Sequence, residues 1–418
     1  MNISRSSVAV DGVPRLLSIN AYHYVRGGAD VVYFEHAKLF EAHGWQNTFS
    51  SMHHSENLAS VDSNFFAEEI DYHKPGGGLQ KLVHAARVIW STEARHKIAK
   101  LLDTVDVDIA HVHNIYHHQS PSILAELKSR GIPVVLTAHD LKLACPNNKM
   151  MNRTGICERC KGGHVWNVAR FRCIQDSLPA STLIAAEAAV HKTFRLYERY
   201  LDRIVTPSRF YRDKLIEWGW DGAKIVHIPN FILQDNVKPA PAGGNYLLYF
   251  GRLASEKGLS TLIRASAASL VPVMLAGIGP EEAMLRALAT ELKAPVTFAG
   301  FRSGEALWQL VRDARAVVLP SEWYENGPMS TIEAFARGKP LVGANIGGIP
   351  ELIANGTTGW IFTSGDVDDL AGALTRAWTA TMSELREKGA FAHERAQTEF
   401  SSSTYYTRMS DLYATLIR

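Results

Sequence analysis

Two glutamates, Glu325 and Glu333, stand eight residues apart in a segment whose residue types could bind a polyhydroxylated ligand. The apolar run at residues 316–319 predicts a buried strand, and Gly327-Pro328 predicts a turn into a helix near Met329. One carboxylate would then lie in the strand-to-helix loop, and the other about a turn and a half into the helix. The helix N-terminus between them favours anions. Hydroxyl acceptors beside an anion site suit a sugar nucleotide, whereas an isolated pair of glutamates is usually helix-surface charge.

A pair of cations follows another predicted strand, at residues 246–250. Arg252 and Lys257 lie five residues apart, and a helical pattern opens at Leu259. A short loop can bring both cations to one point, where two positive charges and a helix end would clamp a diphosphate. For an isolated pair of this kind, solvated surface charges are the alternative.

Three further signals come just after predicted strands. Gly27 and Gly28 follow the first strand and would let the backbone approach a ligand closely, with an ordinary tight turn as the alternative. His139 follows the strand at residues 133–137 and would point into a cleft, unless it is an ordinary structural histidine. Gly347-Gly348 predicts another turn at the edge of the second sheet. Around Gly27 the three-glycine dinucleotide fingerprint is lacking, so nicotinamide chemistry is not supported.

The elements that must position these residues are short apolar strands alternating with helical patterns. Such alternation predicts parallel sheets covered on both faces. The segment 238–244, rich in Pro, Ala and Gly, interrupts the alternation and predicts an interdomain linker. We therefore predict an α/β chain of two doubly wound, Rossmann-like domains facing across a cleft. The predicted strands lie at residues 15–19, 107–112, 133–137, 203–206, 225–228, 246–250, 272–275, 296–298, 316–319 and 340–342.

Size and composition exclude several classes of protein. A chain of 418 residues with 46% hydrophobic content can bury two cores. The formal net charge of +2 argues against a dedicated nucleic-acid binder, and no apolar run reaches membrane-spanning length. Residues 1–13 lack the apolar core of a signal peptide and are expected to form a loose tail. The protein is therefore expected in the cytoplasm, where it could still touch the inner face of the cell membrane.

Taken together, these motifs resemble the retaining glycosyltransferases of family 4, which have the GT-B fold. Phe231, after Ile228-Pro229-Asn230, departs from the family, which often has glycine there. The resemblance implies an acceptor-side domain at residues 1–237, a nucleotide-sugar-binding domain at 245–400, and a helix at 401–418 that crosses back to the first domain. The matching residues are Gly27-Gly28, Thr137-Ala138-His139-Asp140, Gly251-Arg252-Leu253, Glu256-Lys257-Gly258, Pro320-Ser321, Glu325 through Glu333, Gly338-Lys339-Pro340, and Gly347-Gly348 with Glu351.

The resemblance also implies roles for side chains. Arg252 and Lys257 would neutralise the leaving diphosphate. Glu333 would accept hydrogen bonds from both ribose hydroxyls of the donor. Glu325 would contact hydroxyls of the donor sugar, which His139 would reach from the other domain.

Backbone groups would complete the implied donor site, at Gly27 and Gly28 and at Gly327, Pro328 and Met329. The donor would be a UDP or GDP sugar. Preorganised cations and N–H groups would stabilise the leaving phosphate, so no catalytic metal is expected. Members of the family retain the anomeric configuration, and we hypothesise same-face attack in which the leaving phosphate accepts the proton of the acceptor.

All four cysteines lie in one window, within a predicted insertion at residues 141–175. Cys157 and Cys160 have the close spacing of a metal knuckle, and Cys145 and Cys173 flank them at 12 and 13 residues. Because the cytosol disfavours disulfides, a structural zinc site is predicted here, with free or paired thiols as the alternative. A zinc-binding nucleic-acid module is disfavoured by the near-neutral charge.

The acceptor side gives a weaker signal. The segment 74–100 interleaves apolar and basic residues, and such a stretch can lie on an anionic membrane surface. A polyprenyl-linked glycan acceptor in capsule or O-antigen assembly would suit that placement, and a solvated helix face over the first core is the alternative. The basic residues are Lys74, Lys81, Arg87, Arg95, Lys97 and Lys100. Candidates for lining the acceptor side are Tyr22, His23, Tyr24, Arg26, Asn114, Tyr116, His117 and His118.

The leading hypothesis is an enzyme that moves a hexosyl group from a nucleoside-diphosphate sugar to an acceptor hydroxyl in cell-surface polysaccharide or glycolipid assembly. A sugar-nucleotide epimerase or a phosphorylase of the same fold is one alternative. The block from Glu325 to Glu333 matches the transferases better, and the cofactor lysine of a phosphorylase is not recognisable. A non-catalytic sugar-nucleotide-binding protein is the other alternative, against which the intact set of Arg252, Lys257, Glu325 and Glu333 argues.

Overall fold

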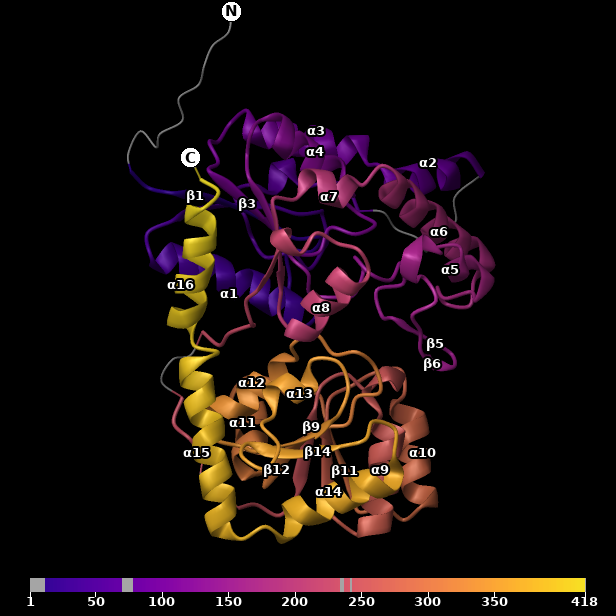
Figure 1. Cartoon of the computed structure of the whole chain (residues 1–418), viewed down its shortest axis with the longest axis vertical. Helices are drawn as coiled ribbons and strands as arrows, with labels where there is room; N and C mark the ends of the chain where they lie inside the picture. Colours follow the sequence, from indigo (N-terminus) through magenta and orange to yellow (C-terminus); the bar gives the residue numbers. More distant parts are fainter. Residues whose placement is uncertain (1–11, 70–77, 234–236, 241–242, 418) are drawn as a thin grey trace, which may run out of the picture.

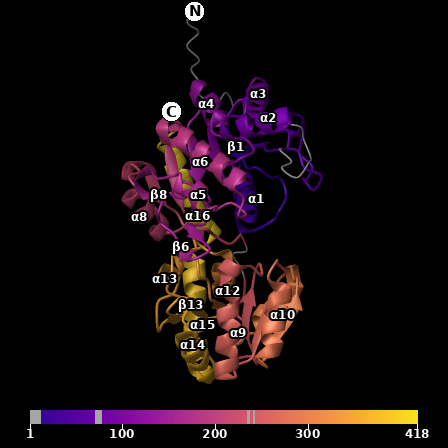
Figure 2. The same ribbon diagram turned by 90° about the vertical axis from the view of Figure 1, so that its right-hand side faces the viewer.

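The computed structural model describes residues 12–69, 78–233, 237–240 and 243–417, and the side chains of residues 78–82 are left undescribed. Within these residues two six-stranded parallel sheets form one domain each, stacked along the long axis of the molecule (Figures 1 and 2). The strand order is β2-β1-β3-β4-β7-β8 in the first sheet and β11-β10-β9-β12-β13-β14 in the second. The prediction of two doubly wound α/β domains is therefore confirmed.

The strands of the first sheet are β1 Arg15–Ile19, β2 Gln46–Ser50, β3 Ile109–Val112, β4 Val134–Thr137, β7 Arg203–Thr206 and β8 Ile225–His227. Those of the second are β9 Leu247–Phe250, β10 Val273–Ala276, β11 Val296–Gly300, β12 Ala316–Leu319, β13 Leu341–Ala344 and β14 Gly359–Phe362. Central strands such as β3, β4, β12 and β13 are buried throughout, because helices cover both faces of a parallel sheet. The sequence prediction missed β2 and β14, which are edge strands.

Helices connect the strands in both domains. In the first domain they are α1 Gly28–Ala42, α2 Gly78–Ile89, α3 Thr92–Leu102, α4 Ser122–Ser129, α5 Asn167–Arg170, α6 Leu178–Thr193, α7 Leu196–Tyr200 and α8 Arg209–Glu217. In the second they are α9 Leu259–Ser269, α10 Glu282–Glu291, α11 Gly304–Asp313, α12 Met329–Ala336, α13 Ile349–Leu352, α14 Val367–Thr379 and α15 Met382–Thr398. Single 3-10 turns lie at η1 Ser63–Phe65, η2 Lys161–Gly163, η3 Gly222–Lys224 and η4 Ser255–Lys257. No helix in the described residues is both long and apolar enough to cross a bilayer.

The last helix, α16 Ser402–Ala414, returns from the second domain to the first. Figure 1 shows α15 lying along the second domain and α16 along the first, beside α1. Met409 and Tyr413 of α16 are fully buried in a cluster with strand residues of the first sheet. Phe231, the departure from the family pattern, stacks on Tyr405 of α16 with ring centroids 4.1 Å apart. The residue at this position therefore anchors the C-terminal helix.

Candidate active site

Glu325 lies in the loop between β12 and α12, where it is 4% exposed. Lys257 Nζ donates a hydrogen bond to Glu325 Oε1 at 2.7 Å, and Ser321 Oγ donates to the same oxygen at 2.6 Å. Lys257 is the last residue of η4, and its ammonium lies 4.9 Å from the centroid of the Trp323 ring. Because an ammonium has three N–H donors, Lys257 can hold Glu325 and also donate to a phosphate. The structure thus brings together the acid and the cation that sequence analysis assigned to one ligand.

The backbone of Glu325 rests on the Gly347-Gly348 turn. Gly348 N–H donates to the Glu325 carbonyl at 2.8 Å. Gly347 has a φ of +58°, and a Cβ built there would lie 2.6 Å from Glu325 N. Only a glycine permits so close an approach without displacing the Glu325 peptide. The turn could be predicted from the sequence but its partner could not, because the contact joins two loops that are distant in sequence.

Arg252 lies in the same loop as Lys257, between β9 and η4, and its side chain is exposed. Its backbone carbonyl accepts a hydrogen bond from Tyr249 O–H at 2.7 Å, which fixes the path of the loop. Both predicted cations therefore follow the carboxyl end of β9, a central strand of the second sheet. Ligands of doubly wound domains bind at such strand ends.

Glu333, in α12, faces the first domain. Burial raises the pKa of Glu333 to about 7, although the charge of Arg337 acts in the opposite direction. Burial also raises the pKa of Glu35 in α1 to about 7, and the negative charge of Glu333 adds to that increase. A Cβ built on Gly28, the first residue of α1, would lie 3.3 Å from Met329 Cγ, in the first residue of α12. Two helix N-termini and two carboxyl groups therefore meet between the domains.

Gly27 and Gly28, which the sequence predicted to approach the donor, lie at the start of α1, and that role stays a prediction. Gly27 has an extended backbone and no close neighbour at its Cβ position, and Gly28 approaches Met329 of the second domain. Glu35 was not predicted. Its position two turns beyond Gly28 on α1, on a side that faces α12, could have been inferred only after the domains were docked.

His139 lies just after β4 and hydrogen-bonds to a second histidine. His139 Nε2 is 2.7 Å from His113 Nδ1, and burial lowers the pKa of His139 to about 4. Asn326, the residue after Glu325, donates its Nδ2 hydrogen to the Ala138 carbonyl at 2.7 Å. This bond places His139 beside the loop of the second domain that carries Glu325.

Other bonds fix the same interdomain arrangement. Ser208 Oγ donates to Asn326 Oδ1 at 2.8 Å, and Asn230 Nδ2 donates to the Gly327 carbonyl at 2.8 Å. Glu351 accepts hydrogen bonds from the backbone N–H groups of Arg209, at 2.8 Å, and of Phe210, in the first turn of α8. Glu351 was predicted as a family match, but the helix that it caps could not be predicted from the sequence.

The four cysteines gather around the short hairpin of β5 Met151–Asn152 and β6 Gly155–Ile156. Cys145 and Cys160 are buried, and a hydrogen bond with the Cys160 thiol lowers the pKa of Cys145. Burial raises the pKa of Cys173 to about 11. Within the described residues, however, no group of three or more His, Cys, Asp or Glu side chains is arranged to hold a metal ion. The structural zinc site predicted at Cys145, Cys157, Cys160 and Cys173 is therefore not shown and stays a prediction.

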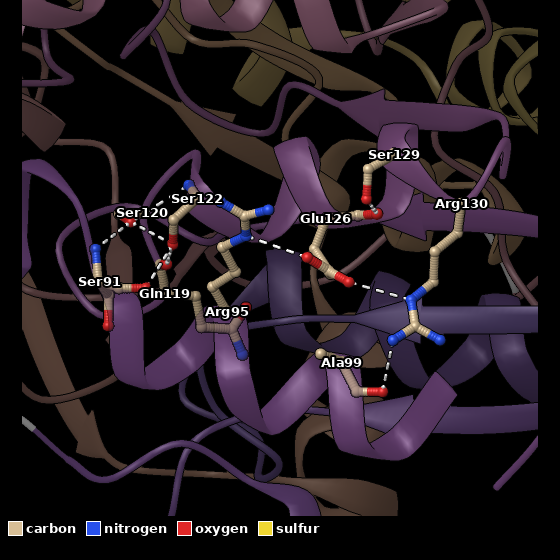
Figure 3. Close-up of polar contacts among 9 residues, drawn as sticks. All are labelled: Ser91, Arg95, Ala99, Gln119, Ser120, Ser122, Glu126, Ser129 and Arg130. Carbon is tan, nitrogen blue, oxygen red and sulfur yellow. Dashed lines mark hydrogen bonds and ion pairs between the residues drawn. The ribbon is translucent and has the colours of Figure 1, made fainter. Parts of the chain in front are cut away.

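The basic stretch proposed for membrane contact is two helices rather than one. Lys74 lies outside the described residues, and the side chain of Lys81 is undescribed. Arg87 pairs with Glu93 at 3.0 Å. Arg95 pairs with Glu126 of α4, also at 3.0 Å (Figure 3). These two cations therefore neutralise acids of their own domain, which weakens the expectation of a membrane-facing charge stripe.

Aromatic side chains line the part of the first domain assigned to the acceptor. The Arg26 guanidinium lies 3.2 Å from the centroid of the Tyr22 ring, and Tyr22 O–H is 3.1 Å from His118 Nε2. Tyr24 stacks on His54 with centroids 4.5 Å apart. These rings come from the loop between β1 and α1 and from loops next to it, at the carboxyl edge of the first sheet.

Comparisons with known proteins show the family of the chain. The model of glycosyltransferase family 4 matches residues 26–234, and that of glycosyl transferases group 1 matches residues 231–390. The glycogen synthase of Mycobacterium tuberculosis is 30% identical over 241 residues, which cover 55% of this chain and 58% of the relative. The amylovoran biosynthesis glycosyltransferase AmsK of Erwinia amylovora is 27% identical over 49% of this chain and 54% of the relative. The matches thus span little more than half of these relatives.

Solved structures resemble nearly the whole chain. Sucrose-phosphate synthase from Thermosynechococcus elongatus has a TM-score of 0.69 at 20% identity, covering 97% of this chain and 99% of that one. Anabaena HepE, in complex with UDP and glucose, has a TM-score of 0.67 at 18% identity, covering 96% and 100%. At this identity the likeness concerns the fold, and it confirms the predicted GT-B arrangement.

Proposed function

Because the chain belongs to glycosyltransferase family 4, we propose that it transfers a hexosyl group from a nucleoside-diphosphate sugar to an acceptor hydroxyl, with retention of the anomeric configuration. The observation that supports this most directly is the ion pair between half-buried Lys257 and buried Glu325, at 2.7 Å, beside the N-terminus of α12. A cation, an acid and free backbone N–H groups in one place match the parts of a donor molecule: diphosphate and sugar hydroxyls.

In this proposal, preorganised groups of the protein stabilise the charges that develop during the reaction. Positive charge grows on the anomeric carbon as the bond to the leaving phosphate breaks, and negative charge grows on that phosphate. Lys257, Arg252 and the N-terminus of α12 stabilise the leaving group. The acceptor oxygen attacks from the face that the phosphate leaves, and its proton passes to the phosphate. Glu325, held by Lys257 and Ser321, orients sugar hydroxyls and forms no covalent intermediate.

The ribose would be bound by Glu333, and the donor sugar would also contact His139 from the first domain. A UDP sugar is the first donor to test, because HepE was solved with UDP and glucose. Thermal unfolding with UDP, GDP and ADP sugars identifies the class, since a ligand that binds only the folded state raises the unfolding temperature. Equal shifts for all three bases would exclude base selectivity at the site.

Alanine variants of Glu325, Arg252 and Lys257 test the assigned roles. With donor and acceptor present, each is expected to slow the release of nucleoside diphosphate by about 100-fold or more, the usual cost of removing a group that stabilises developing charge. Arg386→Ala, which removes an exposed cation from α15, is the matched control and should keep normal turnover. Near-normal turnover in all three site variants would refute the proposal. Binding of the donor without release of diphosphate in the wild-type protein would favour a sugar-nucleotide-binding protein.

We propose a role in cell-surface polysaccharide or glycolipid assembly, on a sugar or polyprenyl-linked acceptor at the inner face of the membrane. AmsK, a relative named for amylovoran biosynthesis, supports this role. Sedimentation with anionic liposomes tests the membrane contact, and failure to bind them would remove it. Metal analysis tests the cysteine prediction in the same preparation, and less than one zinc per chain after mild purification would count against a structural zinc site.

A further inference from the structure

Five buried aromatic side chains with polar tips lie behind the proposed donor site. His36 belongs to α1, His111 and His113 lie on or just after β3, and Tyr405 and Tyr413 belong to α16. Tyr413 O–H hydrogen-bonds to His36 Nε2 at 3.0 Å and to His111 Nδ1, and Tyr405 O–H is 2.9 Å from His36 Nδ1. Buried polar groups are costly unless they are paired, and here the C-terminal helix supplies the partners of two histidines.

His113 connects this cluster to His139. Its ring stacks on His111 with centroids 4.7 Å apart and meets Tyr33 edge-on at 5.3 Å. Its Nδ1 lies 2.7 Å from His139 Nε2, and the two rings are within 13° of coplanar. His113 is fully buried, and its contacts with His111, Tyr33 and His139 restrict the orientation of its ring. A fixed ring that hydrogen-bonds one nitrogen of His139 also fixes the direction of the other nitrogen.

The hydrogen bond also selects a tautomer. Burial holds the pKa of His113 well below its ordinary value, and it lowers the pKa of His139 to about 4, so both imidazoles are neutral near pH 7. One of the two bonded nitrogens must carry the hydrogen. His113 Nε2 is buried without a partner in the described structure. A hydrogen on that atom would be an orphaned N–H, which folded proteins avoid more strictly than a bare acceptor. The hydrogen therefore lies on His113 Nδ1, which donates to His139 Nε2.

We propose that His113 is a positioning residue that holds His139 as the Nδ1–H tautomer, so that a neutral N–H donor faces an oxygen of the donor sugar. This inference rests on the proposed function, because it assumes that His139 contacts the donor. Asn326 supports the assumption, since it ties Ala138 to the loop of Glu325. A neutral donor suits this place, because a cation there would oppose the positive charge that grows on the anomeric carbon.

Four variants test the inference: His113→Leu, His113→Asn, His139→Ala and the double variant His113→Leu/His139→Ala. His113→Leu removes the donor, and we expect kcat to fall by about tenfold, in the range seen when a hydrogen-bond partner that orients a functional histidine is lost. UDP affinity should change less than twofold, because in the proposal His139 contacts the donor sugar and not the nucleotide. Asn can place an N–H near the Nδ1 position, so His113→Asn should recover most of the activity. When His139 is already alanine, adding His113→Leu should lower kcat by less than a further twofold, because the two residues act through one contact.

The outcomes separate the two hypotheses. Normal transfer by His139→Ala would remove the role of His139 and with it a part of the proposed function. If His139→Ala has a lower kcat, but the losses of the two single variants multiply in the double variant, the positioning role of His113 is wrong. Should His113→Leu fail to fold, His113→Asn is compared with His113→Asp, whose carboxylate would draw the hydrogen of His139 to Nε2 and raise its pKa. A pH profile of kcat/KM that is the same for Asn and Asp would overturn the inference.

Discussion

At the scale of single residues, the unusual feature of the site is a pair of carboxyl groups that face each other from different domains. Burial raises the pKa of Glu333 to about 7, and burial together with the negative charge of Glu333 raises the pKa of Glu35 to about 7. Near neutral pH the pair therefore carries about one proton. In the proposed binding mode a ribose donates two hydroxyl hydrogens to Glu333, which must then be ionised, so we expect donor binding to be linked to the loss of that proton.

Nucleotide affinity should therefore depend on pH. Between pH 6 and pH 8 the ionised fraction of a group with a pKa near 7 rises about tenfold, and UDP should bind about tenfold more tightly. Glu35→Gln removes the repulsion, so it should lower the pKa of Glu333 and shift the rise to lower pH. Calorimetric titration in buffers of different ionisation enthalpy measures both the affinity and the protons released. Glu333→Gln is the control. If UDP affinity still rises with pH in this variant, the pH dependence comes from the phosphates of UDP and not from Glu333.

The same pair predicts how stability depends on pH. Both carboxyl groups have folded-state pKa values above the ordinary value of 4.5. Their stabilising contribution to the free energy of unfolding is thus fully present below about pH 4.5 and is lost as the pH rises through about 7. Glu35→Gln should stabilise the protein at pH 8, by about 1 kcal/mol or more, and leave it nearly unchanged at pH 5. Urea unfolding at the two pH values checks the sign, and equal effects at both would exclude the repulsion.

Gly347 offers a test of how strictly Glu325 must be placed. Gly347→Ala would put a Cβ 2.6 Å from Glu325 N, so the acid must shift. Gly356 also has a positive φ, +86°, but a Cβ there has open space. Both substitutions should cost about 1–2 kcal/mol through backbone strain. Only Gly347→Ala should also reduce kcat by tenfold or more, and steady-state kinetics of the two variants, both confirmed as folded, would separate placement from strain.

At the scale of elements, α8 is the joint between the domains. Its first N–H groups bind Glu351 of the second domain, and its capping residue Ser208 both accepts from Tyr211 N–H at 3.1 Å and donates to Asn326. Glu351→Ala removes a carboxylate from a helix N-terminus and leaves Ser208 as the only side-chain cap in the described residues. We expect a loss of about 1 kcal/mol in stability and a wider distribution of domain orientations. Thermal unfolding measures the stability, and small-angle scattering measures the distribution of domain orientations. An unchanged scattering curve would mean that other contacts hold the domains together.

The elements also mark the limit of sequence analysis. Strands such as β12 and the loops that follow them could be predicted, because buried apolar runs and glycine turns are local signals. Edge strand β2, Gln46–Ser50, was missed because its residues are polar and it pairs on one side only. The partners of Glu351 and Gly347 could not be predicted, since each contact depends on how two loops or two domains dock. His113 was missed for the same reason: a neighbour 26 residues away gives it its role.

At the scale of the whole molecule, the cysteine-rich insertion joins the first domain to the donor loops of the second. Lys149 pairs with Glu256, the residue before Lys257, at 3.3 Å. Glu158 accepts a hydrogen bond from Tyr324 O–H, next to Glu325, at 2.8 Å and pairs with Lys214 of α8 at 2.9 Å. The insertion thus contacts the residues next to both members of the Lys257–Glu325 ion pair, and these contacts link the two domains.

Glu158→Gln tests whether this contact controls the donor site. The amide keeps the shape of the side chain but loses the charge that holds Lys214 and Tyr324, so the bond between the domains weakens. Glu217→Gln is a matched control, because Glu217 also pairs with Lys214, at 2.9 Å, but within the described residues it has no hydrogen bond or ion pair with the second domain. We expect Glu158→Gln to raise the KM for the donor several-fold and Glu217→Gln to leave it unchanged, while both lower stability by less than about 1 kcal/mol. Equal KM values in the two variants would mean that the insertion is only a neighbour of the site, and that the other interdomain contacts position the domains.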